Sequence, residues 1–345
     1  MADFITGLRP FMILGDLTEL EVASTAPDVT VEVASDGVPV FSESFIPSEG
    51  KVTVHNFQEI LAPLVSQQSI ALIQLTVKDT NSTATRQLYV LYCAISLPSS
   101  FVDTHFLSMG QEQRDTFPDA DEVLYFASTT ATDDNAYCTV IASLTFFREA
   151  TNEVFSEDVE VGRFFCLNTI ARVDVSPRKF QRAGCVLLSF VIYAEHRQMA
   201  YKVQQQPAPF PVYFRNAFGL YETAYFWGVV KTSISGERAS AWINGTKQNY
   251  KVDTSYEWEA NSGLVNAGAI ALMADLARSR EVLISPMDVK LNVLVSDLKL
   301  EADNDDSSLN SCKVTLVQAK KNQPLFSGAS DVSGIFDNSF DATFN

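Results

Sequence analysis

Few segments of this sequence have the residue types and spacing that metal binding or catalysis requires. The segment EADNDDSS, residues 301–308, places oxygen ligands at alternate positions, as the start of an EF-hand loop does. In a loop that starts at Asp303, the alternate ligands would be Asp303, Asp305 and Ser307. The sixth position of that loop, Ser308, is not glycine, and the twelfth, Val314, cannot supply the bidentate carboxylate. We therefore expect an acidic, solvated hairpin between two strands, and we predict no metal and no other cofactor.

A second segment has the spacing of a catalytic motif. Ser176 and Lys179 form an SxxK string, but the SDN and KTG strings that accompany it in penicillin-recognising enzymes are absent. The three histidines, His55, His105 and His196, lie in different segments, and their spacing indicates neither a metal site nor a Ser-His-Asp triad. Phosphate-binding, dinucleotide-binding and zincin motifs are also missing. The sequence therefore predicts a protein that is not an enzyme.

The cysteines are widely spaced and odd in number. No CxxC occurs, so neither a disulfide framework nor a zinc ribbon is expected. They stand among apolar neighbours, which favours small buried hydrophobic side chains over catalytic thiols. The five positions are Cys93, Cys138, Cys166, Cys185 and Cys312.

The charge balance limits the classes of partner. A net charge of -17 argues against free nucleic acid and against an anionic membrane surface, because both attract clustered Lys and Arg. It is compatible with a basic protein partner. The apolar run 11–14 is too short for the core of a signal peptide, so we expect synthesis in a cytoplasm.

The pattern of the chain predicts a mainly β protein, made of chained β-sandwich-like modules with one helix packed in each of the outer modules. In the first module, residues 1–98, strict alternation over 29–33 predicts a half-buried strand, and Asp36-Gly37 predicts a hairpin turn. A helix follows Asn56 as its N-cap, although Pro63 lies within its apolar pattern.

Two further modules and a C-terminal arm complete the predicted organisation. Short apolar runs separated by turn residues predict a second sandwich-like module over 99–206. The segment QQQPAPFP, residues 204–211, is predicted to be an extended linker. The third module, 207–325, has strands that include TAYFWGVV and one helix over 263–279, capped by Asn261 or Ser262.

The third segment is rich in aromatic residues. An aromatic β module can bind carbohydrate, but such residues more often form a core or a subunit interface, which is the interpretation favoured here. The residues are Tyr213, Phe214, Phe218, Tyr221, Tyr225, Phe226, Trp227, Trp242, Tyr250, Tyr256 and Trp258.

The stretch VYFRNAFGLYETAYFWGVV, residues 212–230, is the most distinctive in the chain. Its RN-FG--E pattern, followed by strand, hairpin, helix and strand, resembles structural virion proteins of tailed phages and prophages of gut Bacteroidetes, crAss-like phages among them. Short FD-x-[ST]-F strings near their C-termini are similar to GIFDNSFDATFN, residues 334–345. The resemblance implies a tail, baseplate or neck component located in the virion and made in the host cytoplasm. It implies no catalytic residues.

The predicted partner-binding residues lie in the arm 326–345. As a strand, this segment has Phe336, Phe340 and Phe344 on one face and the polar Asp337 and Asp341 on the other. Two alternatives stay open: the strand completes the sheet of its own module, or it docks into a neighbouring chain by adding a strand to that chain's sheet.

The sequence thus favours a non-enzymatic structural component of a phage particle, a multi-copy tail or baseplate subunit. Its expected partners are other virion proteins and copies of itself. The alternatives are a carbohydrate-binding or host-adhesion module, with a host-surface glycan as partner, and a glycan hydrolase. A hydrolase needs two carboxylates facing each other across a cleft.

Overall fold

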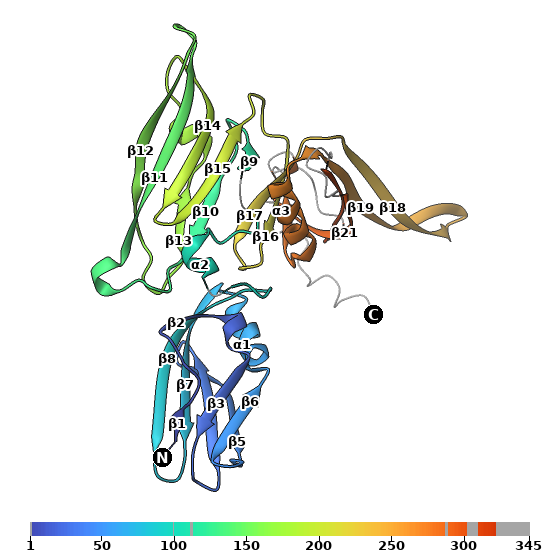
Figure 1. Cartoon of the computed structure of the whole chain (residues 1–345). Helices are drawn as coiled ribbons and strands as arrows, with labels where there is room; N and C mark the ends of the chain where they lie inside the picture. Colours follow the sequence, from blue (N-terminus) through green and yellow to red (C-terminus); the bar gives the residue numbers. More distant parts are fainter. Residues whose placement is uncertain (1, 99, 111–112, 287–288, 302–309, 322–345) are drawn as a thin grey trace. The chain divides into compact units, whose positions relative to one another are not determined.

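The computed structural model describes residues 2–98, 100–110, 113–286, 289–301 and 310–321. The protein is mainly β, with sandwich-like modules and helices in the outer ones, which confirms the predicted fold class (Figure 1). The chain forms two compact units. The first contains Met1–Pro207 and Arg215–Glu222, and the second contains Ala208–Phe214 and the chain from Thr223 onward. The finer division at 98/99 and 206/207 stays a prediction.

The first unit begins with two sheets and a helix. One sheet has the order β1-β3-β6, and the other has the order β2-β8-β7-β4-β5. The alternating valines of β4 are buried, while the intervening Thr30 and Glu32 are half-buried, as the pattern predicts. The strands are β1 (Asp3–Phe4), β2 (Phe11–Ile13), β3 (Glu19–Ala23), β4 (Val29–Ser35), β5 (Val38–Phe45), β6 (Lys51–His55), β7 (Ile70–Lys78) and β8 (Thr83–Leu91).

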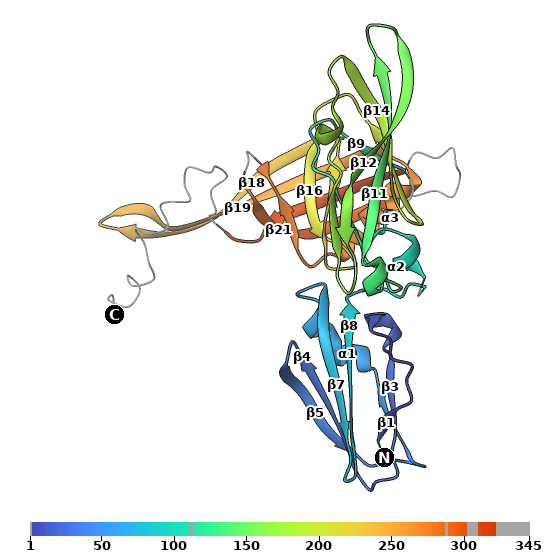
Figure 2. The ribbon, with the colours of Figure 1, turned by 90° about the vertical axis from the view of Figure 1, so that its left-hand side faces the viewer.

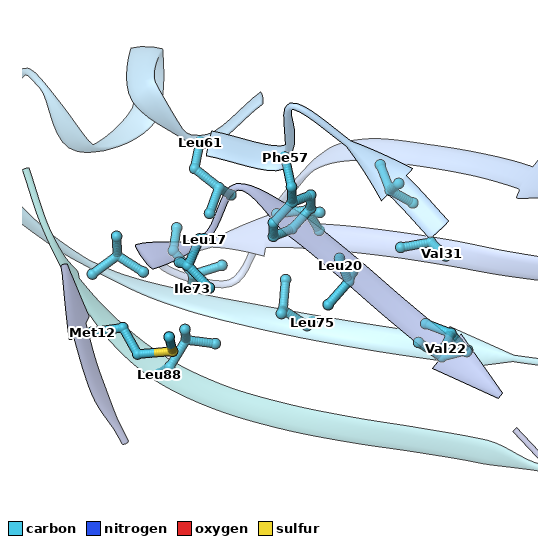
Figure 3. Packing of buried hydrophobic residues seen from close by; sticks show 14 of the residues in the cluster. Met12, Leu17, Leu20, Val22, Val31, Phe57, Leu61, Ile73, Leu75 and Leu88 are labelled. Atoms are coloured by element: carbon cyan, nitrogen blue, oxygen red, sulfur yellow. The ribbon is translucent and has the colours of Figure 1, made fainter. Parts of the chain in front are cut away.

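Helix α1 (Phe57–Val65) packs on this core through Phe57 and Leu61, which lie close to Leu17, Leu20 and Ile73 in Figure 3. It follows Asn56 as predicted and continues through Pro63. The Asn56 side chain, however, makes no capping bond. Its backbone is left-handed, with φ 53°, and the Phe57 N–H donates to the Thr18 carbonyl instead.

The rest of the first unit is a five-stranded sheet of order β12-β11-β14-β15-β9, with a two-stranded sheet of β10 and β13. Within this part, residues 177–180 of the SxxK segment form a short 3-10 turn. The elements are α2 (Phe101–Thr104), β9 (Gln113–Thr116), β10 (Val123–Phe126), β11 (Tyr137–Arg148), β12 (Glu153–Phe165), β13 (Ala171–Asp174), β14 (Cys185–Ala194) and β15 (Arg197–Val203).

The second unit is built on a seven-stranded sheet of order β17-β16-β20-β21-β22-β19-β18. Helix α3 (Ala267–Arg278) contacts β21 and β22, and Leu276 lies in the core with Trp258 and Val314. The strands are β16 (Phe210–Arg215), β17 (Tyr221–Phe226), β18 (Val230–Ile243), β19 (Thr246–Val265), β20 (Val282–Ile284), β21 (Leu291–Glu301) and β22 (Asn310–Gln318). None of the helices in the described residues is long and apolar enough to cross a membrane.

The predicted start and cap of the second helix are wrong. Strand β19 continues to Val265, and the N-cap is Asn266, whose side chain accepts from the Ala269 N–H at 2.9 Å. The residues predicted as caps serve a strand irregularity instead. Asn261 accepts from Gly263 N–H, and the Ser262 hydroxyl accepts from Cys312 N–H, each at 2.8 Å.

The predicted strand TAYFWGVV is two strands. It divides at Trp227-Gly228, between β17 and β18. The Gly228 N–H donates to the Asn261 carbonyl at 2.9 Å, and a Cβ at position 228 would lie only 2.7 Å from that oxygen. Glycine is thus required because another backbone approaches closely.

Candidate functional site

The residues considered for catalysis have structural partners. The Ser176 hydroxyl donates to Asp174 at 2.6 Å, and Lys179 forms an ion pair with the same carboxylate at 2.9 Å. Burial raises the pKa of the Cys138 thiol to about 11 and that of Cys312 to about 12, so both thiols stay protonated near neutral pH. Within the described ranges, no group of three His, Cys, Asp or Glu side chains is placed to hold a metal ion.

The RN-FG--E stretch forms a buried polar connection within the first unit. The Asn216 side-chain oxygen accepts from the N–H groups of Phe218 and Leu220, and its amide donates to Leu107 O at 2.8 Å and to Glu222 at 3.1 Å. Glu222 in turn pairs with buried Arg114 at 2.6 Å. These residues are buried and hold a turn.

This turn also explains the glycine and phenylalanine of the pattern. Gly219 has φ +73°, and a Cβ there would meet the Ser69 hydroxyl at 3.0 Å, so a larger residue does not fit without strain. Phe218 is fully buried in a cluster with Phe11, Leu91 and Phe101. The most distinctive sequence pattern therefore has a structural role that binds distant parts of the first unit together.

The candidate interaction site is the outer part of the hairpin β18–β19, residues 234–256. From here on this hairpin is called the arm, and it is a different segment from the predicted C-terminal arm, 326–345. Strand β22 pairs with β19 only as far as Glu257, so beyond this point β18 is the one strand that pairs with β19 among the residues that the structure describes. Figures 1 and 2 show the paired strands extending past the rest of their sheet. Ten residues of strand correspond to roughly 30 Å.

Local sequence chemistry explains why the arm forms a hairpin. Asn244 and Gly245 have φ values of 51° and 77°, as a two-residue type I′ turn requires. Near the turn the register shifts: Ala239 pairs with Lys251 and Ser240 pairs with Asn249, which leaves Tyr250 as the extra residue of a bulge. Bulges redirect side chains and increase local twist.

The arm exposes apolar side chains that a two-stranded ribbon cannot cover by itself. Trp242 is 74% exposed and Tyr250 is 67% exposed, and Ile234, Ile243 and Val252 are also exposed. An isolated hairpin is only marginally stable in water, and aromatic residues of this kind are frequent energetic centres of protein interfaces. The arm therefore has the properties of a surface that a partner covers.

The base of the arm carries its own charge compensation. Lys321 forms an ion pair with Glu237 at 3.0 Å and approaches Asp253 at 3.9 Å. The hydrogen bond to Glu237 raises the pKa of Lys321. Beyond these two acids, the only charged residues over 238–252 are Arg238, Lys247 and Lys251.

A second candidate site is an open cavity of about 530 Å3 in the first unit. His105 and His196, which lie far apart in the sequence, both line it. The His105 ring stacks on Phe101 with centroids 4.7 Å apart, and its Nδ1 lies 2.9 Å from the Thr104 hydroxyl. The complete lining is Thr104, His105, Gln113, Val191, Tyr193, His196, Gln198 and Ala200.

The predicted partner-binding residues Phe336, Phe340, Phe344, Asp337 and Asp341 lie outside the described residues, and most of the acidic segment 301–308 does too. The aromatic set divides: Phe214, Phe218, Phe226 and Trp258 are buried, whereas Trp242 and Tyr250 lie exposed on the arm. Sequence reasoning missed the arm. Its available signal was Asn244-Gly245 between two long strands.

Comparisons with known proteins give limited similarity. No family model matches the chain, and no curated protein does. Among solved structures, a chain of the virion of a native gene transfer agent particle is 10% identical over 34% of this chain and 95% of its own, with a TM-score of 0.25. A chain from the tail of an empty particle is 11% identical over 32% and 91%, with a TM-score of 0.24. A titin structure is 10% identical over 59% and 99%, with a TM-score of 0.23. Scores of this size carry no argument here.

Proposed function

We propose that this chain is a non-enzymatic structural component of a phage particle, a multi-copy tail or baseplate subunit that acts through protein–protein contacts. One observation carries the proposal: the arm exposes Trp242, Tyr250 and Val252 on a ribbon in which, within the described ranges, two strands pair with each other alone. The resemblance of residues 212–230 and 334–345 to structural proteins of tailed phages supports the same class.

The test asks whether the protein is in the particle and whether the arm holds it there. Purified particles are analysed by mass spectrometry, and the density of the chain is located by cryo-EM. Particles are then assembled with Trp242→Ala in place of the natural chain. We expect reduced incorporation, because truncation of a central interface aromatic typically costs 2 kcal/mol or more, about thirtyfold in affinity.

Ile46→Ala is the matched control, because Ile46 is also a highly exposed large hydrophobic residue but lies outside the arm. We expect normal incorporation of this variant. Absence of the natural protein from purified particles would overturn the proposed function. Equal incorporation of both variants would instead show that the arm makes no essential contact.

The cavity beside β14 and β15 favours a second candidate function, a glycan-binding adhesion module. Tyr193 offers a partly exposed aromatic ring, and Gln113 and Gln198 contribute amide side chains to the lining. A ring with converging polar groups is the usual composition of a small-ligand site. This candidate predicts binding on a glycan array that Tyr193→Ala abolishes, and a glycan array without any bound sugar refutes it.

A further inference from the structure

The outer part of the arm has a charge opposite to that of the remaining chain. Residues 238–252 contain three Lys and Arg residues and no Asp or Glu. The full chain has 25 Lys and Arg and 42 Asp and Glu, so the other residues carry 22 positive and 42 negative charges, a net of -20. A positive, aromatic ribbon on such a protein fits an acidic surface, and copies of this same chain supply acidic surfaces.

Strand β12 (Glu153–Phe165) is the acidic surface that best matches the arm. It contains Glu153, Glu157, Asp158 and Glu160 against a single Arg163, a net charge of -3. Arg148 pairs with Glu153 at 3.6 Å, and Arg182 pairs with Glu157. Within the described part of the chain, Asp158 and Glu160 have no ion pair, and their spacing of two places them on one face of the strand.

The position of β12 also leaves it open to strand addition. It lies at the edge of its five-stranded sheet and, in the part of the chain that the structure describes, pairs with β11 alone. Val154 is 62% exposed, and Val159 and Phe165 are also exposed. A long, exposed edge strand with apolar side chains is a template for pairing with another chain, because one row of its backbone N–H and C=O groups has no strand beside it.

A second edge strand of the first unit, β5, is less suitable than β12 for pairing with the arm. Strand β5 (Val38–Phe45) is an edge strand with exposed Val38 and Val40. Pro39 lies within it and supplies no N–H to a ladder, and Glu43 is its only acidic residue. Strand β12 has 13 residues, no proline and four acids, so charge and hydrogen-bonding capacity both favour it.

We propose, resting on the proposed structural function, that the arm of one copy docks along the β12 edge of a second copy. Backbone hydrogen bonds extend the sheet of the second copy, and Arg238 and Lys247, which lie on the same face of the hairpin as Trp242, face its carboxylates. Trp242 covers the exposed apolar side chains. Lys251 lies on the opposite face and pairs with Asp253 of its own hairpin at 3.2 Å. The two surfaces are different, so the contact is head-to-tail. Repetition of such a contact produces a closed ring or an open filament.

Charge reversal on each surface tests the docking. The arm variant is Arg238→Glu with Lys247→Glu, and the edge variant is Asp158→Lys with Glu160→Lys. Sedimentation velocity of the full chain is measured over a concentration series in about 0.1 M salt, where a Debye length of about 10 Å preserves contact electrostatics. We expect the natural chain to associate and each variant alone to associate at least about tenfold more weakly.

Two combinations give results that a loss of folding cannot imitate. A chain carrying all four substitutions has complementary surfaces again and should recover association. A mixture of the two variants should associate again, because the natural arm of the edge variant meets the natural edge of the arm variant and the two reversed surfaces are also complementary. Glu43→Lys on β5 is the control and should leave association unchanged. Circular dichroism of every variant should match that of the natural chain.

The outcomes separate the two proposals. Recovery in the four-substitution chain supports docking on β12. If the arm variant loses association while the edge variant keeps it, the docking site is elsewhere, and this inference fails while the proposed function stands. A natural chain that stays monomeric at every concentration also overturns the inference. The proposed function fails separately, if purified particles lack the protein.

Discussion

Glu122 gives the first unit a pH dependence whose sign can be worked out. This carboxyl is buried and accepts a hydrogen bond from the Thr116 hydroxyl at 2.9 Å. Burial raises its pKa from the ordinary value of 4.5 to about 7, against the opposing attraction of Arg114. Glu122→Gln keeps an acceptor for Thr116 but never ionises, so it isolates the cost of the buried charge.

The folded state retains the Glu122 proton between pH 4.5 and pH 7, where the unfolded state has lost it. The stability contributed by the neutral carboxyl is therefore complete below pH 4.5, declines as pH rises towards 7, and stays low above it. A difference of about 2.5 pKa units corresponds to about 3 kcal/mol. Relative to the natural chain, Glu122→Gln should gain about this much unfolding free energy between pH 4.5 and pH 8.

Urea unfolding should be followed by methyl NMR of Val140 and Ile192, which are buried in the core of this part of the first unit. Tryptophan fluorescence is unsuitable, because all three tryptophans, Trp227, Trp242 and Trp258, lie in the second unit. Glu43→Gln, at an exposed acid on β5, is the control substitution. If the natural chain and Glu122→Gln keep a constant difference at both pH values, burial does not hold this carboxyl neutral.

Three further substitutions test individual contacts. Glu222→Ala should destabilise the first unit by about 3–5 kcal/mol in the same NMR titration, because Arg114 would remain buried without its closest charge partner. Gly228→Ala should destabilise the second unit by about 1–3 kcal/mol in urea unfolding followed by tryptophan fluorescence, because the new Cβ would overlap the Asn261 carbonyl. Asn266→Ala should cost about 1 kcal/mol by the same measurement, through loss of the α3 cap.

Each substitution has a matched control or a contradicting result. Gly236→Ala, in the same unit, places a Cβ 3.9 Å from the nearest atom, the Asp253 carbonyl oxygen, so it should be nearly neutral where Gly228→Ala is costly. Replacement of both Arg114 and Glu222 by apolar residues should recover much of the loss that Glu222→Ala causes. An unchanged unfolding midpoint for Asn266→Ala would show that the side-chain cap contributes nothing measurable to α3.

Local sequence patterns predicted strands and helix starts that depend mainly on residues nearby in the sequence. The alternating valines of β4 were predicted to be buried because a half-buried strand has period two. Helix α1 begins after Asn56, as predicted. The Phe57 N–H at its start, however, donates to the Thr18 carbonyl and not to the Asn56 side chain. That carbonyl belongs to a distant turn, and no sequence pattern near Asn56 indicates it.

The arm shows the limit of this reasoning. The sequence drew attention to the aromatic residues Trp242 and Tyr250 but did not predict that the hairpin that carries them extends beyond its pairing with β22. Whether such a strand is covered depends on how far β22 reaches along β19, and β22 comes some fifty residues later in the chain. The division of the aromatic residues into buried Trp258 and exposed Trp242, both on neighbouring strands, follows from this single difference in strand length.

The sequence by itself determined the mainly β class, the helices of the outer modules and the excess of acidic residues, since these depend on composition and local periodicity. The tertiary structure alone decided which polar residues meet. It brought Glu222 to Arg114 and Asn216 to the Leu107 carbonyl, each from about a hundred residues away, and His105 and His196 to one cavity. It also left Trp242 and Tyr250 exposed on the two strands of the arm. Long-range contacts of this kind depend on strand order and register, because these decide which side chains lie opposite one another.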